Sequence, residues 1–377
     1  MDKQTIAVFV GTYLPFSETF IYDQLQRQNH FQAHVFAYGK GEHRHRFTYP
    51  HKTILSPLEK PLYTVLGKAP RFSQSLNRIN PALIHAHFGP NGVLATPFAR
   101  SRNIPLAVTF HGHDIGGLLG RNRHTIRYLR YNIYAQKMFE YGSMFLAASK
   151  EIADMLKDIF KVPEEKVILH RLGISLENFV YTERPHRPAH IIMIGRFVEK
   201  KGFIYGLEAF SRVHKKFPDS KITIVGNGPL RPEYETLIHA KGIQEAVSFP
   251  GVLTADKIRS LMHSADIIMA PSVVSASGDR ESGILVLKEA GATGLPGIGT
   301  MHGGIPEIIE HEKTGFLVPE RDVLALGNYL EKLVIDHSLR TELGRNARNK
   351  IKKEYNSELQ NQRLESIFTE IIKKHKK

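Results

Sequence analysis

Short apolar segments alternate along this chain with longer segments in which apolar residues recur at helical spacing. The short segments predict strands in the first half at residues 6–10, 34–37, 83–86, 106–110, 144–148 and 167–169, and in the second half at residues 191–194, 222–225, 247–249, 267–270 and 297–299. Helical patterns lie between most of them, as at residues 202–215 and 230–240. Such alternation is typical of α/β proteins with doubly wound parallel sheets.

A polar segment at residues 181–188 interrupts this alternation near the middle of the chain. It holds two prolines and precedes a new strand, so it predicts a linker. The chain would then form one Rossmann-like domain over residues 1–183 and a second over residues 189–355, with a terminal helix at about 356–377 that packs back on the first. Two such domains would leave a cleft between them, and ligands of open α/β sheets bind beyond the carboxyl ends of the strands.

The composition limits the class of protein. The chain has 377 residues, of which 42% are hydrophobic and 23% charged, as in water-soluble globular proteins. It has no cysteine, which excludes disulfides, thiolate metal sites and a cysteine nucleophile. The start of the chain lacks the apolar stretch of a signal peptide, and no apolar run reaches the roughly 18 residues that span a bilayer. We therefore expect a cytoplasmic protein.

The charge balance predicts an acidic partner. Lys and Arg number 51 against 37 Asp and Glu, a formal net charge of +14. Basic residues cluster at 43–46, 121–130 and 371–377, and solvated faces are the alternative interpretation. No zinc-finger spacing or RNA-binding signature accompanies them, so specific nucleic-acid binding is not expected. Attraction to an anionic membrane surface at the inner face of the cell membrane fits better.

The segment from residue 278 to 296 carries the most specific chemistry. Glu281 lies in a loop that precedes an apolar helix, and Glu289 follows on that helix. The N–H groups of Gly283, Ile284 and Leu285 would be unpaired donors at the helix start, where phosphates bind. A carboxylate, phosphate-binding amides and a second carboxylate suit the sugar, diphosphate and ribose of a nucleotide sugar. An ordinary amphipathic helix is the alternative.

Two glycine-containing loops follow strands of the second half. Gly195 permits a tight turn, and Arg196 and Lys201 bring two cations to the same loop. Fixed cations stabilise the charge that develops on a departing diphosphate. After the next strand, Gly226 and Asn227 would allow close approach of a ligand such as the nucleotide base. A basic surface turn and a plain turn are the respective alternatives.

Polar side chains also follow strands of the first half. His111 could orient a sugar hydroxyl, whereas other residues could act on an acceptor. These further candidates are Ser17, Glu18, Thr19, His87, His113 and Asp114. Ser17 could instead cap the next helix. Two histidines and an aspartate can also bind a metal, but no further ligand cluster accompanies them.

Together these segments resemble the retaining glycosyltransferases of family 4, which have the GT-B architecture of two facing Rossmann-like domains. The resemblance covers nearly the whole chain and is strongest over residues 191–319. Its most specific motifs are the spacing of Glu281 and Glu289, the loop 195–202 and the run 303–319. Residues 17–21, 85–89 and 278–281 further resemble a subgroup that builds bacterial exopolysaccharide of the colanic acid and amylovoran type.

The resemblance implies a role for each matching residue. Arg196 and Lys201 would hold the diphosphate, and the helix-start amides would complete the phosphate site. Glu281 would contact hydroxyls of the donor sugar, and Glu289 the ribose. His111 would lie near the reacting centre. The donor would be a UDP or GDP sugar and the acceptor a saccharide or lipid-linked saccharide, with no metal or other cofactor.

The sequence departs from the family at two positions. Residues 17–19 stand where many members have a Gly-Gly pair, and Gly297 stands where a β-branched residue is usual. A nucleotide-sugar epimerase and a non-catalytic membrane-attached scaffold remain the alternatives. A dinucleotide oxidoreductase fits less well, because the first strand does not end in the Gly-x-Gly-x-x-Gly turn.

Overall fold

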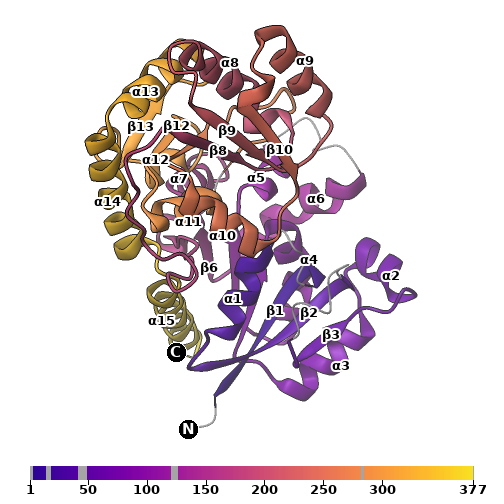
Figure 1. Cartoon of the computed structure of the whole chain (residues 1–377). Helices are drawn as coiled ribbons and strands as arrows, with labels where there is room; N and C mark the ends of the chain where they lie inside the picture. The colour runs from indigo at the N-terminus through magenta and orange to yellow at the C-terminus, as the bar shows by residue number, and fades with distance from the viewer. Residues whose placement is uncertain (1–2, 14–17, 41–48, 120–125, 282–283, 377) are drawn as a thin grey trace. The chain divides into compact units, whose positions relative to one another are not determined.

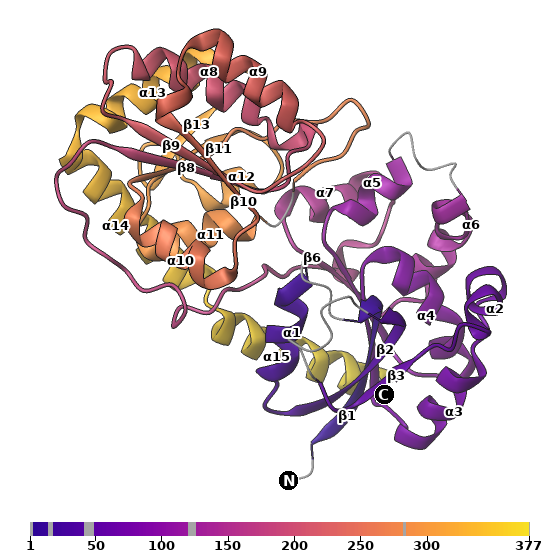
Figure 2. The same ribbon diagram turned by 45° about the vertical axis from the view of Figure 1, so that its right-hand side comes forward.

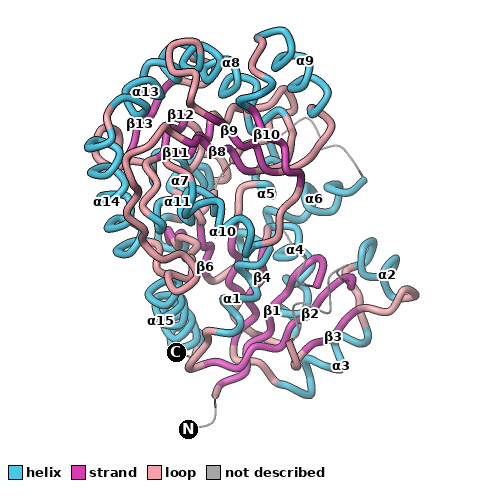
Figure 3. The backbone as a smooth tube through the Cα atoms, viewed as in Figure 1, coloured by secondary structure: helices cyan, strands magenta, loops and turns pink. Residues whose placement is uncertain are grey.

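The computed structural model describes residues 3–13, 18–40, 49–119, 126–281 and 284–376, and the chain divides into two compact units (Figure 1). The first unit comprises Met1–Gly173 together with Ser357–Lys377, and the second comprises Ile174–Asn356. Figure 3 shows that each unit has a sheet of strands flanked by helices. The predicted α/β fold with two doubly wound parallel sheets is confirmed.

The first unit contains a seven-stranded parallel sheet in the order β3-β2-β1-β4-β5-β6-β7. Its central strands β4 and β5 are buried along their whole length because helices cover both faces of the sheet. The strands are β1 (Gln4–Tyr13), β2 (Phe31–Lys40), β3 (Lys52–Ile54), β4 (Leu83–His87), β5 (Leu106–Phe110), β6 (Met144–Ala147) and β7 (Val167–Leu169). The helices are α1 (Thr19–Gln26), α2 (Glu59–Leu66), α3 (Pro70–Ile79), α4 (Gly89–Ser101), α5 (His113–Leu119), α6 (Ile126–Tyr141), α7 (Lys150–Asp158) and α15 (Ser357–His375).

The second unit contains a six-stranded parallel sheet in the order β10-β9-β8-β11-β12-β13. Its strands are β8 (His190–Ile194), β9 (Lys221–Val225), β10 (Val247–Gly251), β11 (Ile267–Ala270), β12 (Gly297–Thr300) and β13 (Gly315–Val318). Its helices are α8 (Phe203–His214), α9 (Arg231–Lys241), α10 (Ala255–Ser264), α11 (Leu285–Thr293), α12 (Ile305–Ile308), α13 (Val323–Ile335) and α14 (His337–Glu354). In both sheets the strand order reverses beside the first strand of the unit.

Two edge elements were missed by the pattern. The strand β3 has three residues, and β13 begins at Gly315, so neither has a long apolar run. The departure at Gly297 has a packing reason. A Cβ at that position would lie 2.8 Å from Cδ1 of Ile309, so the missing side chain lets Ile309 pack on the strand.

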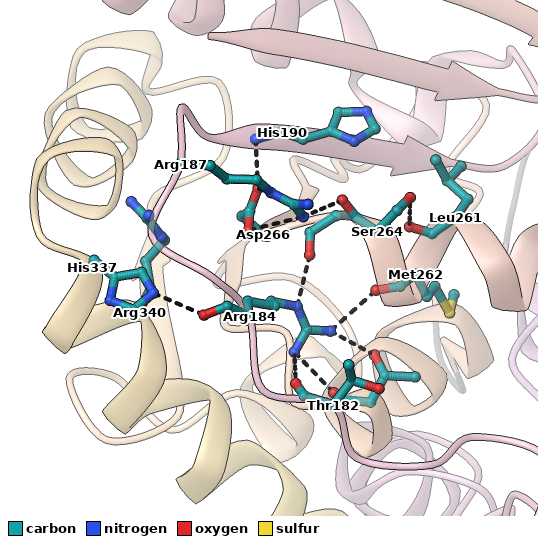
Figure 4. Close-up of polar contacts among 12 residues, drawn as sticks. Thr182, Arg184, Arg187, His190, Leu261, Met262, Ser264, Asp266, His337 and Arg340 are labelled. Atoms are coloured by element: carbon teal, nitrogen blue, oxygen red, sulfur yellow. Dashed lines mark hydrogen bonds and ion pairs between the residues drawn. The ribbon is translucent and has the colours of Figure 1, made fainter.

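The boundary between the units differs from the predicted one. The division falls between residues 173 and 174, because Ile174 pairs with Asn356 and packs in the core of the second unit. The predicted linker 181–188 lies on the second unit, as Figure 4 shows. Its two prolines mark an irregular segment, but Arg184 fastens that segment to the unit.

The guanidinium of Arg184 holds the segment through one carbonyl group within the segment and through carbonyl groups of two distant parts of the chain. Its Nε donates to the carbonyl oxygen of Ala265 at 2.7 Å, and Nη2 donates to that of Met262 at 3.1 Å. Its Nη1 donates to the carbonyl oxygens of Thr182 and Thr293 at 2.7 and 3.0 Å. Burial lowers the pKa of Arg184 to about 10, which leaves it charged at neutral pH.

We expect Arg184→Ala to lower the free energy of unfolding of the second unit by about 3 kcal/mol, because it leaves several buried carbonyl groups without a donor. Denaturant unfolding followed by circular dichroism measures the change. Lys216→Ala is the control, because its partner Glu331 forms an exposed ion pair with it that contributes little. Equal effects of the two substitutions would contradict this role for Arg184.

The terminal helix α15 belongs to the first unit. Phe368 is fully buried and packs edge-on against Phe31 of β2, with ring centroids 5.9 Å apart. His30 donates its N–H to Glu365 at 2.8 Å. Figures 1 and 2 both show the yellow helix beside α1. Among the described ranges, no helix is long and apolar enough to cross a membrane.

Candidate active site

The switch in strand order of the second unit brings two loops together. The strands β8 and β11 are neighbours, and the connections from them leave toward opposite sides of the sheet. Loops beyond the carboxyl ends of such a strand pair form the ligand site of doubly wound folds. The loop after β8 holds Arg196 and Lys201, and the loop after β11 holds Glu281.

The two loops meet through an ion-pair cluster. Nζ of Lys201 lies 3.1 Å from Oε2 of Glu281, and Nζ of Lys200 lies 3.6 Å from Oε1. Lys200 also lies 3.1 Å from Oδ2 of Asp279. The side chains of Lys200, Lys201 and Glu281 are only 12%, 16% and 11% exposed. Residues 80 positions apart in the sequence therefore form one partly buried charged cluster.

The charge state of Glu281 follows from this cluster. Burial acts to raise its pKa, but Lys201 and Lys200 outweigh burial and hold the pKa below its ordinary value of 4.5. The carboxylate is therefore ionised at neutral pH. Its Oε1 is buried, accepts no hydrogen bond from the described residues and has Nζ of Lys200 as its ion-pair partner at 3.6 Å.

His302 fixes the backbone of Glu281, and the sequence reasoning gave it no such role. The N–H of Glu281 donates to Nε2 of His302 at 3.0 Å, so the ring proton lies on Nδ1. This Nδ1 donates to Oε1 of Glu320 at 2.7 Å. The other oxygen of Glu320 accepts the N–H of Val274 at 2.9 Å. A polar chain thus links the ends of β11, β12 and β13.

Arg196 has a different environment from that of Lys201. It is exposed, and within the described ranges its side chain makes no ion pair or hydrogen bond. It lies in the turn that opens with Gly195, where a Cβ would lie 2.8 Å from Cε of Lys201 and would force that lysine side chain to shift. The predicted pair of cations is therefore one arginine open to a ligand and one lysine engaged with Glu281.

The loop after β9, with Gly226 and Asn227, packs against the loop after β8. A Cβ at Gly226 would lie 1.8 Å from the carbonyl oxygen of Gly195, so the loops after β8 and β9 pack directly on each other. Phe197 donates its N–H to the carbonyl oxygen of Asn227 at 2.9 Å. The amide oxygen of the exposed Asn227 accepts the N–H of Gly228. Gly226 is therefore needed for loop packing whether or not it contacts a ligand.

The helix α11 begins slightly later than predicted. Its first residue is Leu285 and its N-cap is Ile284, which has no polar side-chain atom to cap the helix. The open N–H groups of the first turn are those from Ile284 onward. Glu289 is half-buried on the second turn. The predicted Gly283 lies outside the described residues.

The first unit also places predicted residues at the ends of neighbouring strands. Nδ1 of His87, at the end of β4, lies 3.1 Å from Nε2 of His111, just after β5. Burial, together with neighbouring histidines, holds the pKa of His87 well below its usual value, so this ring is neutral. The rings of Phe20 and Phe88 lie 4.9 and 4.5 Å from that of His111.

Phe88 adopts a backbone conformation that costs energy. Its φ of 70° and ψ of 139° lie in a region that residues with a side chain rarely occupy. Such strain costs about 1–3 kcal/mol and persists only where the surroundings enforce it. It turns the chain from β4 into α4 and keeps the Phe88 ring against His111.

The carboxylate of Asp114, predicted to act on an acceptor, is held by backbone N–H groups of two loops. The side chain is buried and accepts the N–H of Gly89 at 3.0 Å, that of Gly112 at 2.8 Å and that of His111 at 3.1 Å. Burial raises its pKa to about 6, although these N–H donors oppose the rise. The carboxylate joins the loops after β4 and β5 and thereby orients His111.

The first loop is described only in part. Ser17 lies outside the described residues, and so do the side chains of Thr19 and His113. Glu18 is the N-cap of α1 and its side chain makes no capping hydrogen bond. Burial raises the pKa of Glu18 to about 7. Within the described ranges, no group of three or more His, Asp or Glu side chains could hold a metal ion.

The raised pKa of Glu18 predicts a pH dependence of stability. Between about pH 4.5 and 7 the unfolded chain releases a proton that the folded chain keeps, so stability falls as the pH rises through this window. We expect Glu18→Gln to be more stable than the wild type at pH 8 by about 1–3 kcal/mol and equal to it at pH 4. Melting temperatures across this range test the prediction, with the 87%-exposed Glu164→Gln as the control. If the melting temperature of Glu18→Gln depended on pH in the same way as that of the wild type, the prediction would be contradicted.

The comparisons with known proteins follow the division of the chain. The profile "Glycosyl transferases group 1" matches residues 176–350, and the profile "Glycosyltransferase Family 4" matches residues 20–178. WcaL of Escherichia coli (strain K12), named for a proposed role in colanic acid biosynthesis, is 32% identical over 75% of this chain and 69% of its own length. The chain belongs to glycosyltransferase family 4.

Other relatives of the enzyme agree with this assignment. The amylovoran biosynthesis glycosyltransferase AmsK of Erwinia amylovora is 31% identical over 75% of this chain and 68% of its own. Among solved structures, sucrose-phosphate synthase from Thermosynechococcus elongatus superposes with a TM-score of 0.76 at 20% identity, covering 98% of this chain and 99% of its own. HepE of Anabaena, solved with UDP, has a TM-score of 0.78 at 17% identity, covering 97% and 100%. These structures share the GT-B fold of the enzyme.

Proposed function

We propose that the enzyme transfers a hexose-type sugar from a nucleoside diphosphate sugar to an acceptor hydroxyl with retention of anomeric configuration. The observation that carries this proposal is the cluster of Lys201 and Glu281 beside the open Arg196, at the strand switch of the second unit. It joins cations suited to a diphosphate with a carboxylate suited to sugar hydroxyls. The names of WcaL and AmsK favour a role in polysaccharide or glycolipid biosynthesis.

The proposed reaction needs no nucleophile from the enzyme. The bond between the anomeric carbon and the diphosphate oxygen breaks, and a bond to the acceptor oxygen forms on the same face of the sugar. The acceptor proton passes to the departing diphosphate oxygen. Arg196 and Lys201 would stabilise the negative charge that develops there, together with the first-turn amides of α11. We propose that these groups do the work for which other transferases use a metal.

Each of the remaining residues would position a reactant. Glu281 would accept hydrogen bonds from donor-sugar hydroxyls, and Glu289 would contact the ribose. Asn227 and Gly226 lie in the neighbouring loop, where a nucleotide base could be bound. His111, held by His87, would lie near the reacting sugar. We propose UDP or GDP as the nucleotide; the solved HepE complex with UDP supports the first.

The acceptor would be a saccharide, free or carried on a lipid. The enzyme would then act in the cytoplasm and associate peripherally with the inner face of the cell membrane. The formal net charge of +14 supports attraction to an anionic lipid surface.

A thermal-shift panel without metal tests the donor site. UDP, GDP, ADP and their sugars are added with a chelator present, and a ligand at 100 times its Kd stabilises by about 2.7 kcal/mol. We expect the nucleotide and nucleotide sugar of one particular base to raise the melting temperature of the wild type. The same ligands should raise that of Arg196→Ala much less. No shift with any nucleotide would oppose the proposal. Release of a rearranged nucleotide sugar without an acceptor would favour the epimerase alternative.

A further inference from the structure

The net positive charge of the chain comes almost entirely from one of the two units. The first unit has 27 Lys and Arg against 15 Asp and Glu, an excess of 12. The second has 24 against 22, an excess of 2. A charge distribution set only by solubility would not need this asymmetry. The first unit is therefore the one that an acidic partner would attract.

The helix α2 of this unit presents apolar residues to solvent. Only Tyr63 of this helix is buried, and it packs edge-on against Phe72. On the outer side, Leu62, Val65 and Leu66 are 36%, 70% and 56% exposed. A surface helix of a globular protein normally has its charged and polar residues there. The outer face of α2 is thus apolar where water alone would favour polar residues.

The neighbouring helix α6 has the same character. Tyr131 and Met138 are buried on its inner side, whereas Leu129 and Ile133 are 51% and 58% exposed. Tyr134 is 37% exposed. Of the fifteen large apolar side chains that the described residues expose, seven lie on α2, on the residue before it, or on α6. Such a concentration marks an interaction surface, whereas single exposed apolar residues are normal.

A groove of about 630 Å³ joins the two helices across α4. Nη1 of Arg130 on α6 donates to the carbonyl oxygen of Val65 on α2 at 2.5 Å, which ties the walls together. Figures 1 and 2 both show α2, α4 and α6 along the same side of the first unit. The groove is lined by Val65, Leu66, Val93, Thr96, Pro97, Arg100, Ser101, Arg130, Tyr134 and Lys137.

The charges of this groove favour an anionic partner. Three of its ten lining residues are cations, namely Arg100, Arg130 and Lys137, and none of the ten is a carboxylate. Cations beside exposed apolar side chains are the arrangement of proteins that lie in the interfacial region of a bilayer. The apolar side chains enter the acyl boundary while the cations meet anionic headgroups.

We propose that the groove and the outer sides of α2 and α6, here called the α2–α6 face, bind the surface of an anionic lipid bilayer. The purpose of this binding rests on the proposed function, because it would bring the enzyme to a lipid-carried acceptor. The binding itself requires neither donor nor catalysis. The contact would be made by the residues of the α2–α6 face, which the net charge of the chain does not identify.

The absence of tryptophan from the chain allows a direct test. A single Val65→Trp substitution gives a fluorophore on the α2–α6 face without background. Ile335→Trp, at a position that is 60% exposed on α13 of the second unit, is the control. We expect vesicles of phosphatidylcholine with phosphatidylglycerol to shift the emission of Val65→Trp to shorter wavelength and to leave that of Ile335→Trp unchanged. Vesicles of phosphatidylcholine alone should have a much smaller effect.

Co-sedimentation with the same vesicles separates the two contributions to binding. Val65→Glu with Leu66→Glu should weaken partitioning by about 30-fold or more, because two apolar side chains no longer enter the bilayer. Arg100→Gln with Lys137→Gln should weaken it by roughly 25-fold, at about fivefold for each cation. The matched controls on the second unit are Leu324→Glu with Ile335→Glu, and Lys215→Gln with Lys241→Gln. They should bind as the wild type does.

Either the vesicle experiments or the oligomeric state could overturn the proposal. In the vesicle experiments, the contradicting result is equal loss of binding in the face variants and in their controls, or unshifted emission from Val65→Trp with anionic vesicles. For the oligomeric state, it is a stable dimer at low concentration that Val65→Glu with Leu66→Glu dissociates, since a second copy of the chain would then cover the face. Arg196→Ala should bind vesicles as the wild type does. Vesicle binding therefore tests the membrane proposal separately from the proposed sugar transfer.

Discussion

Arg196→Ala is expected to lower kcat by about 10²–10³-fold, the usual effect of removing one group that stabilises developing charge. Arg196 is exposed and makes no ion pair within the described ranges, so its substitution costs no interaction of the folded chain. The melting temperature should therefore stay at the wild-type value. Initial rates of sugar transfer and a thermal melt, measured on the same preparation, provide the two quantities.

The control for this experiment is a second exposed arginine of the same unit. Arg345 lies on α14, and Arg345→Ala removes the same charge away from the strand switch. It should leave both kcat and the melting temperature unchanged. Arg196→Lys should fall between wild type and Arg196→Ala, because it keeps the charge and loses the planar fork. Near-normal turnover by Arg196→Ala would exclude a role for this side chain in charge stabilisation.

Glu281→Gln is expected to lower kcat by at least about 10²-fold and the stability of the second unit by about 2–4 kcal/mol. The substitution keeps the backbone N–H that donates to His302 but removes the charge that pairs with Lys201 and Lys200. Two partly buried ammonium groups then lack their shared counter-ion. Transfer kinetics and denaturant unfolding measure the two effects.

The matched control is another carboxylate paired with a lysine. Glu310 lies 2.6 Å from Lys350, and that lysine holds its pKa below the ordinary value. Glu310→Gln should cost stability while leaving kcat unchanged. If Glu281→Gln and Glu310→Gln had the same kinetic effect, Glu281 would have a structural role alone.

The lowered pKa of Glu281 sets the pH range of its contribution. Because the folded-state pKa lies below 4.5, the ion pairs stabilise the fold above about pH 4.5. That contribution is lost as the pH falls through the lower pKa of the folded state. The difference in stability between wild type and Glu281→Gln should therefore shrink in strongly acid solution. It should stay constant between pH 6 and 8.

The pattern of the sequence was sufficient for the order of the described strands other than the edge strands β3 and β13, and for the loops that hold the charged residues. Buried parallel strands are nearly continuous apolar runs, so β5 and β11 could be recognised from their residues alone. The rule that ligand loops follow strand ends then selected the turns with Arg196 and Glu281. The family resemblance added roles that periodicity could not supply.

Contacts between distant segments could not be predicted from the pattern. The approach of Lys200 to Glu281 depends on the adjacency of β8 and β11, which local sequence does not encode. His302 directly precedes the motif 303–319, but its contact with Glu320 depends on the neighbouring strand β13, which was missed. The predicted linker was wrong for a similar reason, because Ala265, Met262 and Thr293, which accept hydrogen bonds from Arg184, are more than seventy residues away.

The terminal helix α15 has a consequence for how the molecule is made. Its residues Leu364 and Phe368 lie in the core of the first unit, although the ribosome adds them after the whole of the second unit. Domains usually fold in the order of their synthesis. Here the second unit is complete first, while the nascent first unit keeps an apolar face uncovered until residues 357–377 have been synthesised. A chain that stopped before α15 would have a complete second unit and an unfinished first unit, a natural substrate for chaperones and proteases.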